Sequence, residues 1–409
     1  MIQKNSKIGY LAWIIGCLFY LYESSLNTIL THMMDPLVRD LAIDSVQFGV
    51  LSSIFLIAYS SLQLPAGIIL DHISIKKVMI GAVATCSLGC LLFASSNSYQ
   101  LILCARFIMG IGSAFAVLST FKIISVWFDT RHFMTLTGLM CTFGTLGHAF
   151  GMAAVHLLDI MSWQSILYLW SALGFGILAI VIMGLKTPLA QEDENISPLT
   201  CSQVIDDLLH IIRYPQVWLI LFFGLLIYAP YLTLTNSWAG KFLENTLSIG
   251  TAASASIAMT VPYGFAIGAP LLSYISDKQG KRKPMLIFST LGTAIILILT
   301  TGPFFTSVIV YKALFFSLGF SISGFLPSFS VIKEITPTRT TATSLGLMNT
   351  FNSLGGAILS PVVGKIIQNN IAHGLARPYA SALYILPACV LIALIFALAS
   401  RETNCTQVK

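Results

Sequence analysis

The stretch Gly67-Ile-Ile-Leu-Asp71-His-Ile-Ser-Ile-Lys76-Lys77 decides the fold, because it is a short charged segment between two long apolar runs. Each run is long enough to cross a bilayer as a helix. The stretch has a second copy, Ser273-Tyr-Ile-Ser-Asp277-Lys278-Gln-Gly280-Lys281-Arg282-Lys283, and 206 residues separate the two aspartates. That offset is about half of the chain, so the sequence predicts two matching halves.

Composition places the chain in lipid. Hydrophobic residues make up 56% of the sequence and charged residues 9%, with a mean hydropathy of +0.84, whereas about a quarter of the residues in a soluble domain are charged. The net charge is +6, but the basic residues fall in alternate loops rather than in one patch, so nucleic acid is not a predicted partner. Only Arg39, Lys241 and Arg377 fall on the opposite side. By the positive-inside rule, the side that carries both termini is predicted to be cytoplasmic.

Apolar runs of about 20 residues predict an all-α integral membrane protein with twelve transmembrane helices. The predicted spans are residues 9–31, 47–70, 77–95, 100–127, 133–156, 163–185, 215–238, 251–275, 284–302, 306–332, 342–369 and 379–400. Six spans fall in each half. The sequence therefore predicts two pseudo-symmetric six-helix bundles, residues 1–185 and 214–409, joined by a cytoplasmic linker at 186–213.

The linker carries one amphipathic stretch. Val204, Leu208 and Ile211 share one face of a predicted helix, and Asp207 and His210 lie on the other, which is the pattern of a helix at a membrane interface. A solvated tether and a regulatory segment both fit this pattern.

The repeated loop resembles the signature of the major facilitator superfamily, Gly-x-x-x-Asp-(Arg/Lys)-x-Gly-(Arg/Lys)-(Arg/Lys), which lies between helices 2 and 3 and again between helices 8 and 9. The second copy has Ser273 in place of the first glycine and keeps Asp277, Lys278, Gly280, Lys281 and Arg282. The first copy departs from the signature at His72, Ser74 and Ile75, and keeps Gly67, Asp71, Lys76 and Lys77. The resemblance implies the major facilitator fold and transport by alternating access.

Further motifs resemble a bacterial nutrient-uptake branch of that superfamily. They are Gln63-x-Pro65-x-Gly67, Arg106-x-x-x-Gly110-x-Gly112-x-Ala114, Tyr214-Pro-Gln-Val-Trp218 and Ala342-x-x-Leu345-Gly-Leu-Met-Asn349. The branch is similar to the phagosomal nutrient transporters of intracellular bacteria and, more distantly, to the lysosomal dipeptide carrier of animals. This resemblance implies a multi-pass protein of the bacterial inner membrane.

Apart from Lys77 at the first position of the third span, five charged residues fall inside the predicted spans: Glu23, Arg106, Lys122, Lys312 and Lys365. Each charge costs roughly 2.5–3.5 kcal/mol in the bilayer centre, so each is a candidate for function. Glu23 and Arg106 have similar depths, and they are predicted either to pair or to bind substrate and proton. Lys312 follows Arg106 by the same 206 residues and is predicted to face the substrate. Lys122 and Lys365 lie near helix ends and are predicted to extend to the interface.

Other polar residues are predicted to line the same central space: Asn27, His148, Tyr228, Tyr231, Asn349 and Asn352. His148 titrates in the physiological range and is predicted either to carry protons or to be a hydrogen-bonded structural residue. Tyr228-Ala-Pro230-Tyr231 is predicted to break the seventh span, because proline removes a backbone donor.

The loops are predicted to form the gate, with an acid at the inner end of span 4 that recurs in span 10. The superfamily resemblance implies that these groups latch the cytoplasmic side and that each loop aspartate caps a facing helix. The alternative is that the loop charges only fix topology. The predicted gating residues are Gly67, Asp71, Lys76, Lys77, Asp129, Arg131, Asp277, Lys278, Gly280, Lys281, Arg282 and Glu334.

Two small-residue motifs allow close helix contact, Gly147-x-x-x-Gly151 in span 5 and Gly264-x-x-x-Gly268 in span 8. The resemblance implies that these two helices face one another and form one sliding seam. Ordinary helix packing is the alternative.

Together these features predict a secondary transporter that takes up an amino acid or a short peptide, driven by a proton gradient and without a cofactor. Efflux of drugs or metabolites by proton antiport, and exchange of organic anions, remain the alternatives. An enzyme is not predicted, because the intramembrane polar residues are scattered and no His-Glu-x-x-His motif occurs. The expected partners are a small solute and the lipid bilayer, and the expected state is a monomer.

Overall fold

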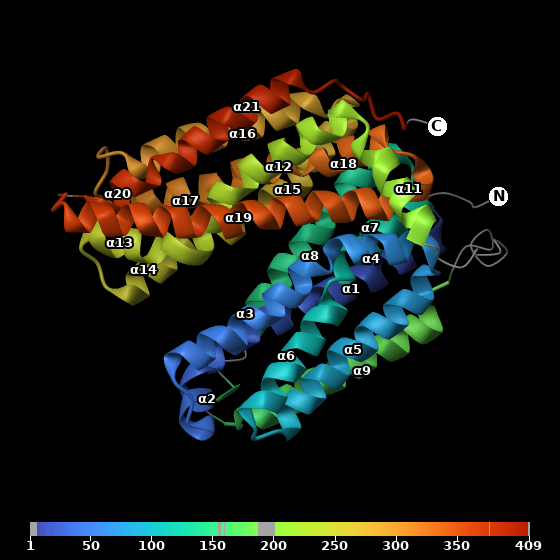
Figure 1. Ribbon diagram of the computed structural model, residues 1–409, viewed down its shortest axis with the longest axis horizontal. Helices are drawn as coiled ribbons and strands as arrows, with labels where there is room; N and C mark the ends of the chain where they lie inside the picture. The colour runs from blue at the N-terminus through green and yellow to red at the C-terminus, as the bar shows by residue number, and fades with distance from the viewer. Residues whose placement is uncertain (1–5, 154–156, 159, 187–200, 376, 408–409) are drawn as a thin grey trace. The chain divides into compact units, whose positions relative to one another are not determined.

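The computed structural model describes residues 6–153, 157–158, 160–186, 201–375 and 377–407 (Figure 1). Half of the predicted linker, residues 187–200, lies outside the described residues. All regular secondary structure of the described residues is helical, as the sequence predicts. The chain divides into two compact units. Unit 1 comprises Met1–Asp129, Phe143–Leu208 and Arg339–Leu347, and unit 2 comprises Thr130–Thr142, Leu209–Thr338 and Met348–Lys409.

The helices of the first half of the chain are α1 (Lys7–Ile29), η1 (Leu30–Met33), α2 (Met34–Leu41), α3 (Ser45–Ser61), α4 (Gln63–His72), α5 (Ile75–Ser95), α6 (Tyr99–Ser113), α7 (Ala116–Trp127), η2 (Thr130–His132), α8 (Phe133–Ala153), α9 (Trp163–Gly184) and α11 (Cys201–Ile212). Those of the second half are α12 (Pro215–Thr233), η4 (Leu234–Trp238), α13 (Ala239–Leu247), α14 (Thr251–Ala258), α15 (Thr260–Gln279), α16 (Lys283–Thr301), α17 (Val308–Ile322), η5 (Ser323–Phe325), α18 (Pro327–Ile335), η6 (Thr338–Thr340), α19 (Thr341–Ala372), α20 (Pro378–Leu383) and α21 (Ile385–Ala399).

In unit 1, α5 packs against α6 and α9, and α1 packs against α7 and α9 (Figure 1). The contacts are mostly apolar and tightly fitted, as between Phe93 and Trp163, whose ring centroids lie 5.9 Å apart. One buried polar contact joins α9 to α1, where the Trp170 indole donates a hydrogen bond to Ser25 Oγ at 3.0 Å. This hydrogen bond satisfies a buried indole donor across two helices.

In unit 2, α16 packs against α17 and α21, α12 packs against α21, and α15 packs against α17. The contact of α15 with α17 is close because both helices present glycine. A Cβ atom at Gly264 would overlap the Phe316 carbonyl oxygen, and one at Gly319 would overlap that of Val261. The two helices approach backbone to backbone as small residues allow.

The helices of spans 5 and 8 meet as expected, because Gly138 of α8 lies against the Ala269 carbonyl oxygen of α15 and the Thr142 hydroxyl donates to the Ala266 carbonyl at 3.0 Å. The expectation that the two glycine motifs form this seam is wrong. Gly147 and Gly151 lie against the carbonyl oxygens of Leu21 and Ser25 in α1, within unit 1. The second motif lies against α17, within unit 2. Both motifs therefore serve packing inside their own unit.

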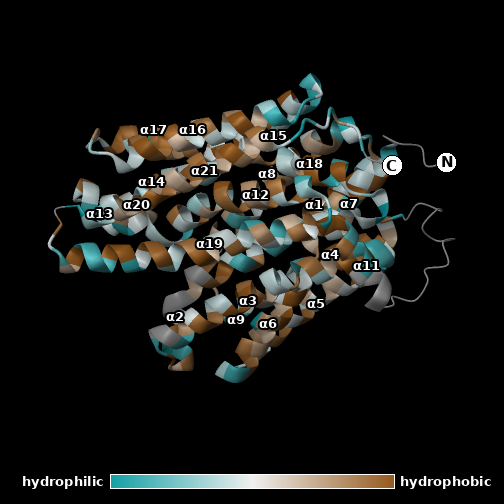
Figure 2. Ribbon diagram, turned by 45° about the horizontal axis from the view of Figure 1, so that its top comes forward, coloured by the Kyte–Doolittle hydropathy of each residue, from teal (hydrophilic) through white to brown (hydrophobic). Residues whose placement is uncertain are grey.

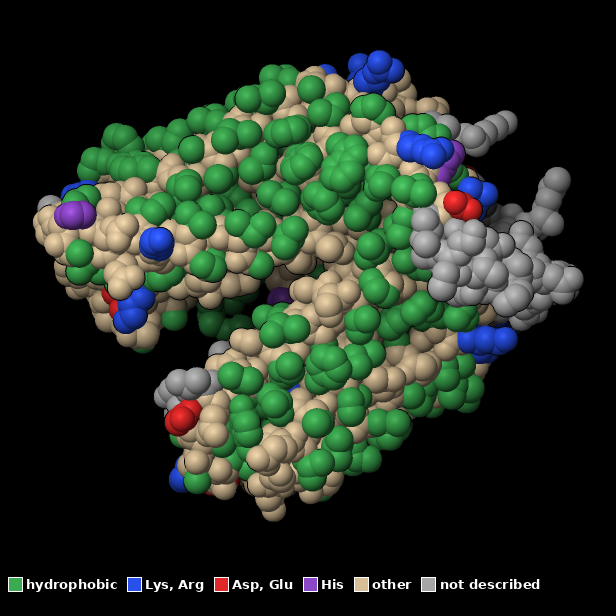
Figure 3. Space-filling view, in the orientation of Figure 1, with side chains coloured by type: hydrophobic (Ala, Val, Ile, Leu, Met, Phe, Trp, Pro, Cys, Tyr) green, Lys and Arg blue, Asp and Glu red, His purple; other side chains and the backbone are tan. Residues whose placement is uncertain are grey.

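Nine helices of the described residues are long and apolar enough to cross a membrane, and the bent pair α3–α4 would make a tenth. Hydrophobic residues fill the middle of the helices, and hydrophilic residues gather near their ends (Figure 2). Large apolar side chains also remain exposed on the helix sides, among them Met183, Ile309 and Ile395, and hydrophobic side chains cover much of the visible surface (Figure 3). Such a surface is stable in lipid and not in water.

Several spans are interrupted. The α3–α4 pair bends by 43° at Leu62, and the fourth and tenth predicted spans each divide into two helices, α6 with α7 and α17 with α18. The seventh span is not broken at Pro230, contrary to the prediction: α12 continues to Thr233, and a π-helical turn follows at Leu234–Trp238. The extra residue in a π-turn absorbs a local mismatch without ending the helix.

Candidate functional site

The aspartate of the first repeated loop, Asp71, contacts the N-terminus of α19 within unit 1. The Asp71 carboxylate accepts hydrogen bonds from the backbone N–H groups of Ala342, at 3.0 Å, and Thr343, at 2.7 Å. The Thr343 hydroxyl adds a third at 2.8 Å. Asp71 thus caps the first turn of α19, where free N–H groups and the helix dipole favour a negative charge.

Lys122 from α7 completes this cluster, with its ammonium group paired to Asp71. The two side chains are 8% and 1% exposed. The expectation that Lys122 extends to the interface is therefore wrong, because a buried carboxylate lies within its reach. Gly67, one turn before Asp71, makes the approach possible, since a Cβ there would overlap the Ala342 carbonyl oxygen.

The second loop forms the corresponding cluster in unit 2. Asp277 Oδ2 accepts hydrogen bonds from the Thr135 backbone N–H and hydroxyl, both at 2.7 Å, in the first turn of α8. Gly138, one turn further, lies against the Ala269 carbonyl oxygen of α15. Each loop aspartate therefore holds the beginning of a helix that starts in its own unit and continues into the other.

Arg282 is the centre of the second cluster, and its side chain is fully buried. Its guanidinium donates to Asp277 at 2.6 Å, to Glu334 at 3.0 and 3.1 Å and to the Thr130 carbonyl at 3.2 Å. Burial alone would lower the pKa of Arg282, but the charges of Glu334 and Asp277 outweigh it and raise the pKa. The arginine thus remains a charged bridge.

The other basic residues predicted for the gate do not join these clusters. Arg131, Lys77, Lys278 and Lys281 are exposed and Lys76 is half-buried, and none of them forms an ion pair with a described residue. Asp129 is half-buried at the end of α7. Gly280 ends α15 in the left-handed conformation, at φ 65°, which glycine adopts without strain.

Two further acids near the clusters are not predicted as gating residues from the sequence. In unit 1, Asp207 of α11 lies 3.0 Å from Arg339 and 3.9 Å from His72. In unit 2, Glu402 follows α21 and accepts hydrogen bonds from the backbone of Arg282 and Lys283. The amphipathic pattern of the linker identifies Asp207 as a residue of the polar face. No spacing in the sequence connects Asp207 to Arg339 or Glu402 to Arg282.

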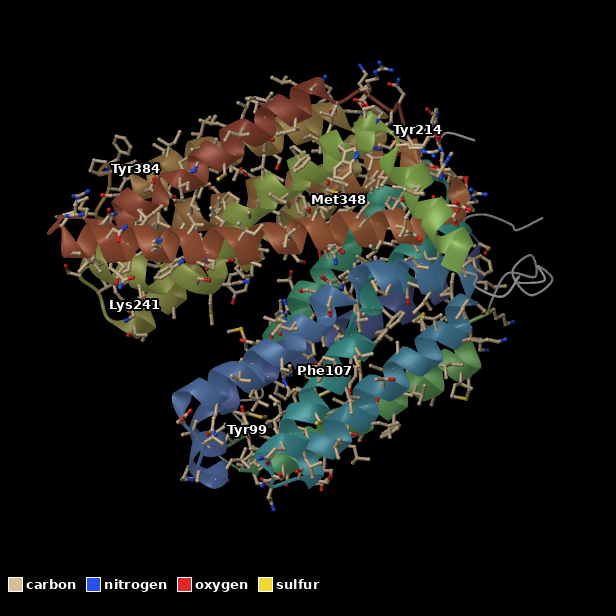
Figure 4. All side chains as sticks on the ribbon, viewed as in Figure 1. Tyr99, Phe107, Tyr214, Lys241, Met348 and Tyr384 are labelled. Carbon is tan, nitrogen blue, oxygen red and sulfur yellow. The ribbon has the colours of Figure 1, made fainter. Side chains whose placement is uncertain are left out.

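Glu23 and Arg106 are both buried in unit 1, at 4% and 1% exposure, yet they form no ion pair. Glu23 accepts a weak hydrogen bond from Ser24 at 3.4 Å. Arg106 donates to the Leu26 carbonyl at 3.0 Å and lies 4.5 Å from the Phe55 ring centroid. The next residue, Phe107, is 42% exposed on α6 (Figure 4), so of these two neighbours Arg106 is the one that points into the unit.

His148 lies in α8, with Nδ1 2.9 Å from the Thr28 hydroxyl and 3.0 Å from the Ser24 carbonyl oxygen. The imidazole itself remains exposed. Its Nδ1 is thus occupied by α1, and Nε2 is available for another partner. Asn27, one residue before Thr28, is half-buried.

Unit 2 holds the other predicted substrate residues. Tyr228 stacks on Phe325 at 4.8 Å and packs on Tyr231 at 5.2 Å, and Tyr231 stacks on Phe265 at 6.1 Å. These rings form an aromatic row from α12, α15 and η5. Lys312 is exposed on α17, unlike the buried Arg106, so the equal offset does not give equal surroundings.

Two asparagines of α19 belong to unit 2. Asn352 is buried, and its Oδ1 has no hydrogen-bond partner among the described residues. It lies against Gly224 of α12, as does Met348, one turn earlier in α19 (Figure 4). Asn349 is half-buried.

Comparison with known proteins identifies the family. Residues 12–361 match the family described as Major Facilitator Superfamily, which is most of the chain. The chain belongs to the Major Facilitator Superfamily. It is a multi-pass membrane protein of that superfamily, and the prediction made from the repeated loop is confirmed.

Curated relatives of this superfamily member are bacterial transporters. A probable galactarate/D-glucarate transporter of Pseudomonas putida is 28% identical over 134 residues, which cover 31% of this chain and 29% of that relative. A gallate transporter of Pseudomonas putida is 24% identical over 421 residues, covering 94% of this chain and 91% of that relative. The fold also matches the crystal structure of the superfamily transporter FucP in its outward conformation, with a TM-score of 0.73, 17% identity, and coverage of 97% of this chain and 100% of that one.

Proposed function

We propose that this superfamily member is a secondary transporter that carries a small organic anion by alternating access, coupled to protons. Arg106 carries the proposal. Its guanidinium is buried in a membrane span, its Nε has no hydrogen-bond partner among the described residues, and Glu23 does not neutralise it. A buried charge without a counter-charge is costly, so a solute carboxylate is a fitting partner for it.

The names of the relatives support the same substrate class. Galactarate, D-glucarate and gallate are all carboxylates, and the relatives named for them are transporters. No relative reported above is named for an amino acid or a peptide, so that expectation has no support, whereas the organic-anion alternative has. Within unit 2 taken by itself, Lys312 and the aromatic row of Tyr228, Tyr231, Phe265 and Phe325 are proposed as substrate contacts in their own right.

The proposal includes twelve transmembrane helices in two bundles, residues 1–185 and 214–409, with the linker at 186–213. Beyond the nine apolar spans and the bent pair, α1 and α8 have 23 and 21 residues and are long enough to cross the membrane. With both termini cytoplasmic, the Asp71 and Asp277 clusters would lie at the cytoplasmic side. The two clusters would act as latches in one conformation. The protein itself is proposed to be a monomer in a bacterial inner membrane.

Proton coupling is proposed for Glu23, with His148 as the next candidate. Both lie in unit 1 on or beside α1, and neither forms an ion pair with a described residue. A group that changes its surroundings between two conformations changes its proton affinity, which lets a proton gradient bias the conformational equilibrium.

Uptake into proteoliposomes tests the proposal. With an imposed proton gradient, the expected result is accumulation of a labelled carboxylate such as galactarate or gallate, and competition by other carboxylates but not by neutral sugars, amino acids or dipeptides. Arg106→Gln should abolish uptake, while Lys365→Gln, which changes an exposed lysine of α19, should not. Transport of peptides or neutral sugars with no response to carboxylates would contradict the organic-anion proposal, and rescue of cells from a lipophilic drug would favour efflux.

A further inference from the structure

Residues 400–407 follow α21 and fold back onto unit 2. Glu402 Oε1 accepts a hydrogen bond from the Arg282 backbone N–H at 2.8 Å, and Oε2 accepts one from that of Lys283 at 2.9 Å. A single carboxylate thus binds the first free N–H groups of α16. This is the place where a negative charge best satisfies a helix N-terminus.

The same segment contacts the end of α18. The Thr403 hydroxyl donates to Glu334, and the Gln407 amide donates to the Lys333 carbonyl at 3.2 Å. Asn404 and Cys405 have positive φ angles of 51° and 56°, which turn the backbone sharply. The segment therefore has a defined fold with contacts to two helices.

Cys405 lies within this turn and is 9% exposed. Burial raises the pKa of its thiol, with smaller opposing and supporting contributions from Arg282 and Glu334. A buried neutral thiol reacts slowly, because the thiolate is the nucleophile. Cys405 is therefore a natural reporter of whether the segment is docked.

Arg282 connects the segment to the latch. Glu402 holds its backbone, and its guanidinium binds Asp277, Glu334 and the Thr130 carbonyl. Asp277 in turn holds the first turn of α8 through Thr135. Glu402 is thus connected to the beginning of α8 by hydrogen bonds through two residues, Arg282 and Asp277.

We infer that Glu402 is a positioning residue of the unit 2 latch: it fixes the Arg282 backbone so that the guanidinium holds Asp277 and, through it, the beginning of α8. This inference rests on the proposed transport function for its consequence, since release of α8 would accompany a conformational change. Loss of a helix-capping group shifts an equilibrium roughly 2- to 30-fold. Loss of Glu402 should therefore loosen the latch by a factor in that range.

The test uses the full-length protein in liposomes, in a Cys201→Ser background, with modification mapped by mass spectrometry. The rate of thiol labelling at Cys405 reports on the segment. In Cys405→Ser protein, a cysteine introduced by Thr130→Cys reports on the beginning of α8. Glu402→Ala should speed labelling at both positions roughly 2- to 30-fold. Glu402→Gln keeps an acceptor oxygen and should have a smaller effect, and it serves in place of Glu402→Ala if that variant does not fold.

Arg401→Gln is the matched control, because Arg401 is the preceding residue and is exposed, and it should leave both rates unchanged. In transport assays, Glu402→Ala should change the maximal rate and leave the KM for the solute unchanged, since Glu402 lies outside the proposed substrate site. Faster labelling at Cys405 alone would reduce Glu402 to an anchor of its own segment, and no change at either position would overturn the inference. Labelling requires no solute, so a parent protein that transports no anion would contradict the proposed function and leave this result standing.

Discussion

Glu23 is a carboxylic acid inside an apolar helix, and its side chain accepts a hydrogen bond from the Ser24 hydroxyl at 3.4 Å and forms no ion pair with a described residue. Glutamine has nearly the same shape and keeps an oxygen that accepts the Ser24 hydrogen bond, but it cannot take up a proton. We therefore expect Glu23→Gln to abolish accumulation driven by a proton gradient while exchange between preloaded vesicles continues. Accumulation against a solute gradient in Glu23→Gln liposomes would make Glu23 a structural residue and His148 the next candidate.

Lys122 neutralises the buried carboxylate of Asp71. Asp71 is 1% exposed and paired with Lys122, so Lys122→Gln leaves a buried carboxylate without its counter-charge. Removal of one partner from a buried ion pair costs about 3–5 kcal/mol. The three hydrogen bonds from α19 remain, so we expect a loss near the lower end of that range.

Thermal unfolding in detergent measures this loss. The double variant Asp71→Asn/Lys122→Gln removes both charges and should recover part of the stability, which a double-mutant cycle would quantify. Equal destabilisation by the single and double variants would mean that the two charges do not support each other.

At the scale of the element, the contact of α4 with the beginning of α19 depends on Gly67. A Cβ there would overlap the Ala342 carbonyl oxygen, which is backbone and cannot move away alone. Gly67→Ala should therefore separate the two helices, weaken the Asp71 cap and slow transport. Gly81→Ala in α5 is the control, because nothing lies within 4 Å of its Cβ position, and it should be neutral or stabilise the helix by up to about 1 kcal/mol. Equal transport rates in both variants would show that the close approach is not needed.

The sequence predicts which functional residues a helix or loop carries better than it predicts which distant residues they contact. The repeated loop predicts Asp71, Asp277 and Arg282 because their spacing is local. Glycine motifs predict close approach but not the partner: Gly147 lies against α1, whereas α8 meets α15 at Gly138. The depth of Lys122 alone predicts a side chain at the interface, and depth does not reveal a carboxylate 51 residues earlier in the chain. Glu402 was missed because a cap formed across 120 residues leaves no periodic pattern.

At the scale of the whole molecule, each of the two units contains an aspartate that caps a helix N-terminus. Each loop aspartate binds the first turn of a helix, α19 in unit 1 and α8 in unit 2, and each such helix continues into the other unit. The 206-residue offset predicts this equivalence. It does not predict the different supports of the two caps, since Lys122 pairs with the first aspartate and Arg282 with the second.

Neutralising each cap separately tests whether both act in one conformational change. Asp71→Asn and Asp277→Asn keep a hydrogen-bonding side chain but remove the charge that favours the helix N-terminus, which contributes about 0.3–2 kcal/mol. Each cap would hold only one conformation, so each variant should slow transport more than it lowers the amount of folded protein in the membrane. Cysteine accessibility on the two membrane faces should shift in the same direction for both variants, and further in the double variant. Normal transport and unchanged accessibility in both single variants would reduce the loop charges to signals of membrane topology.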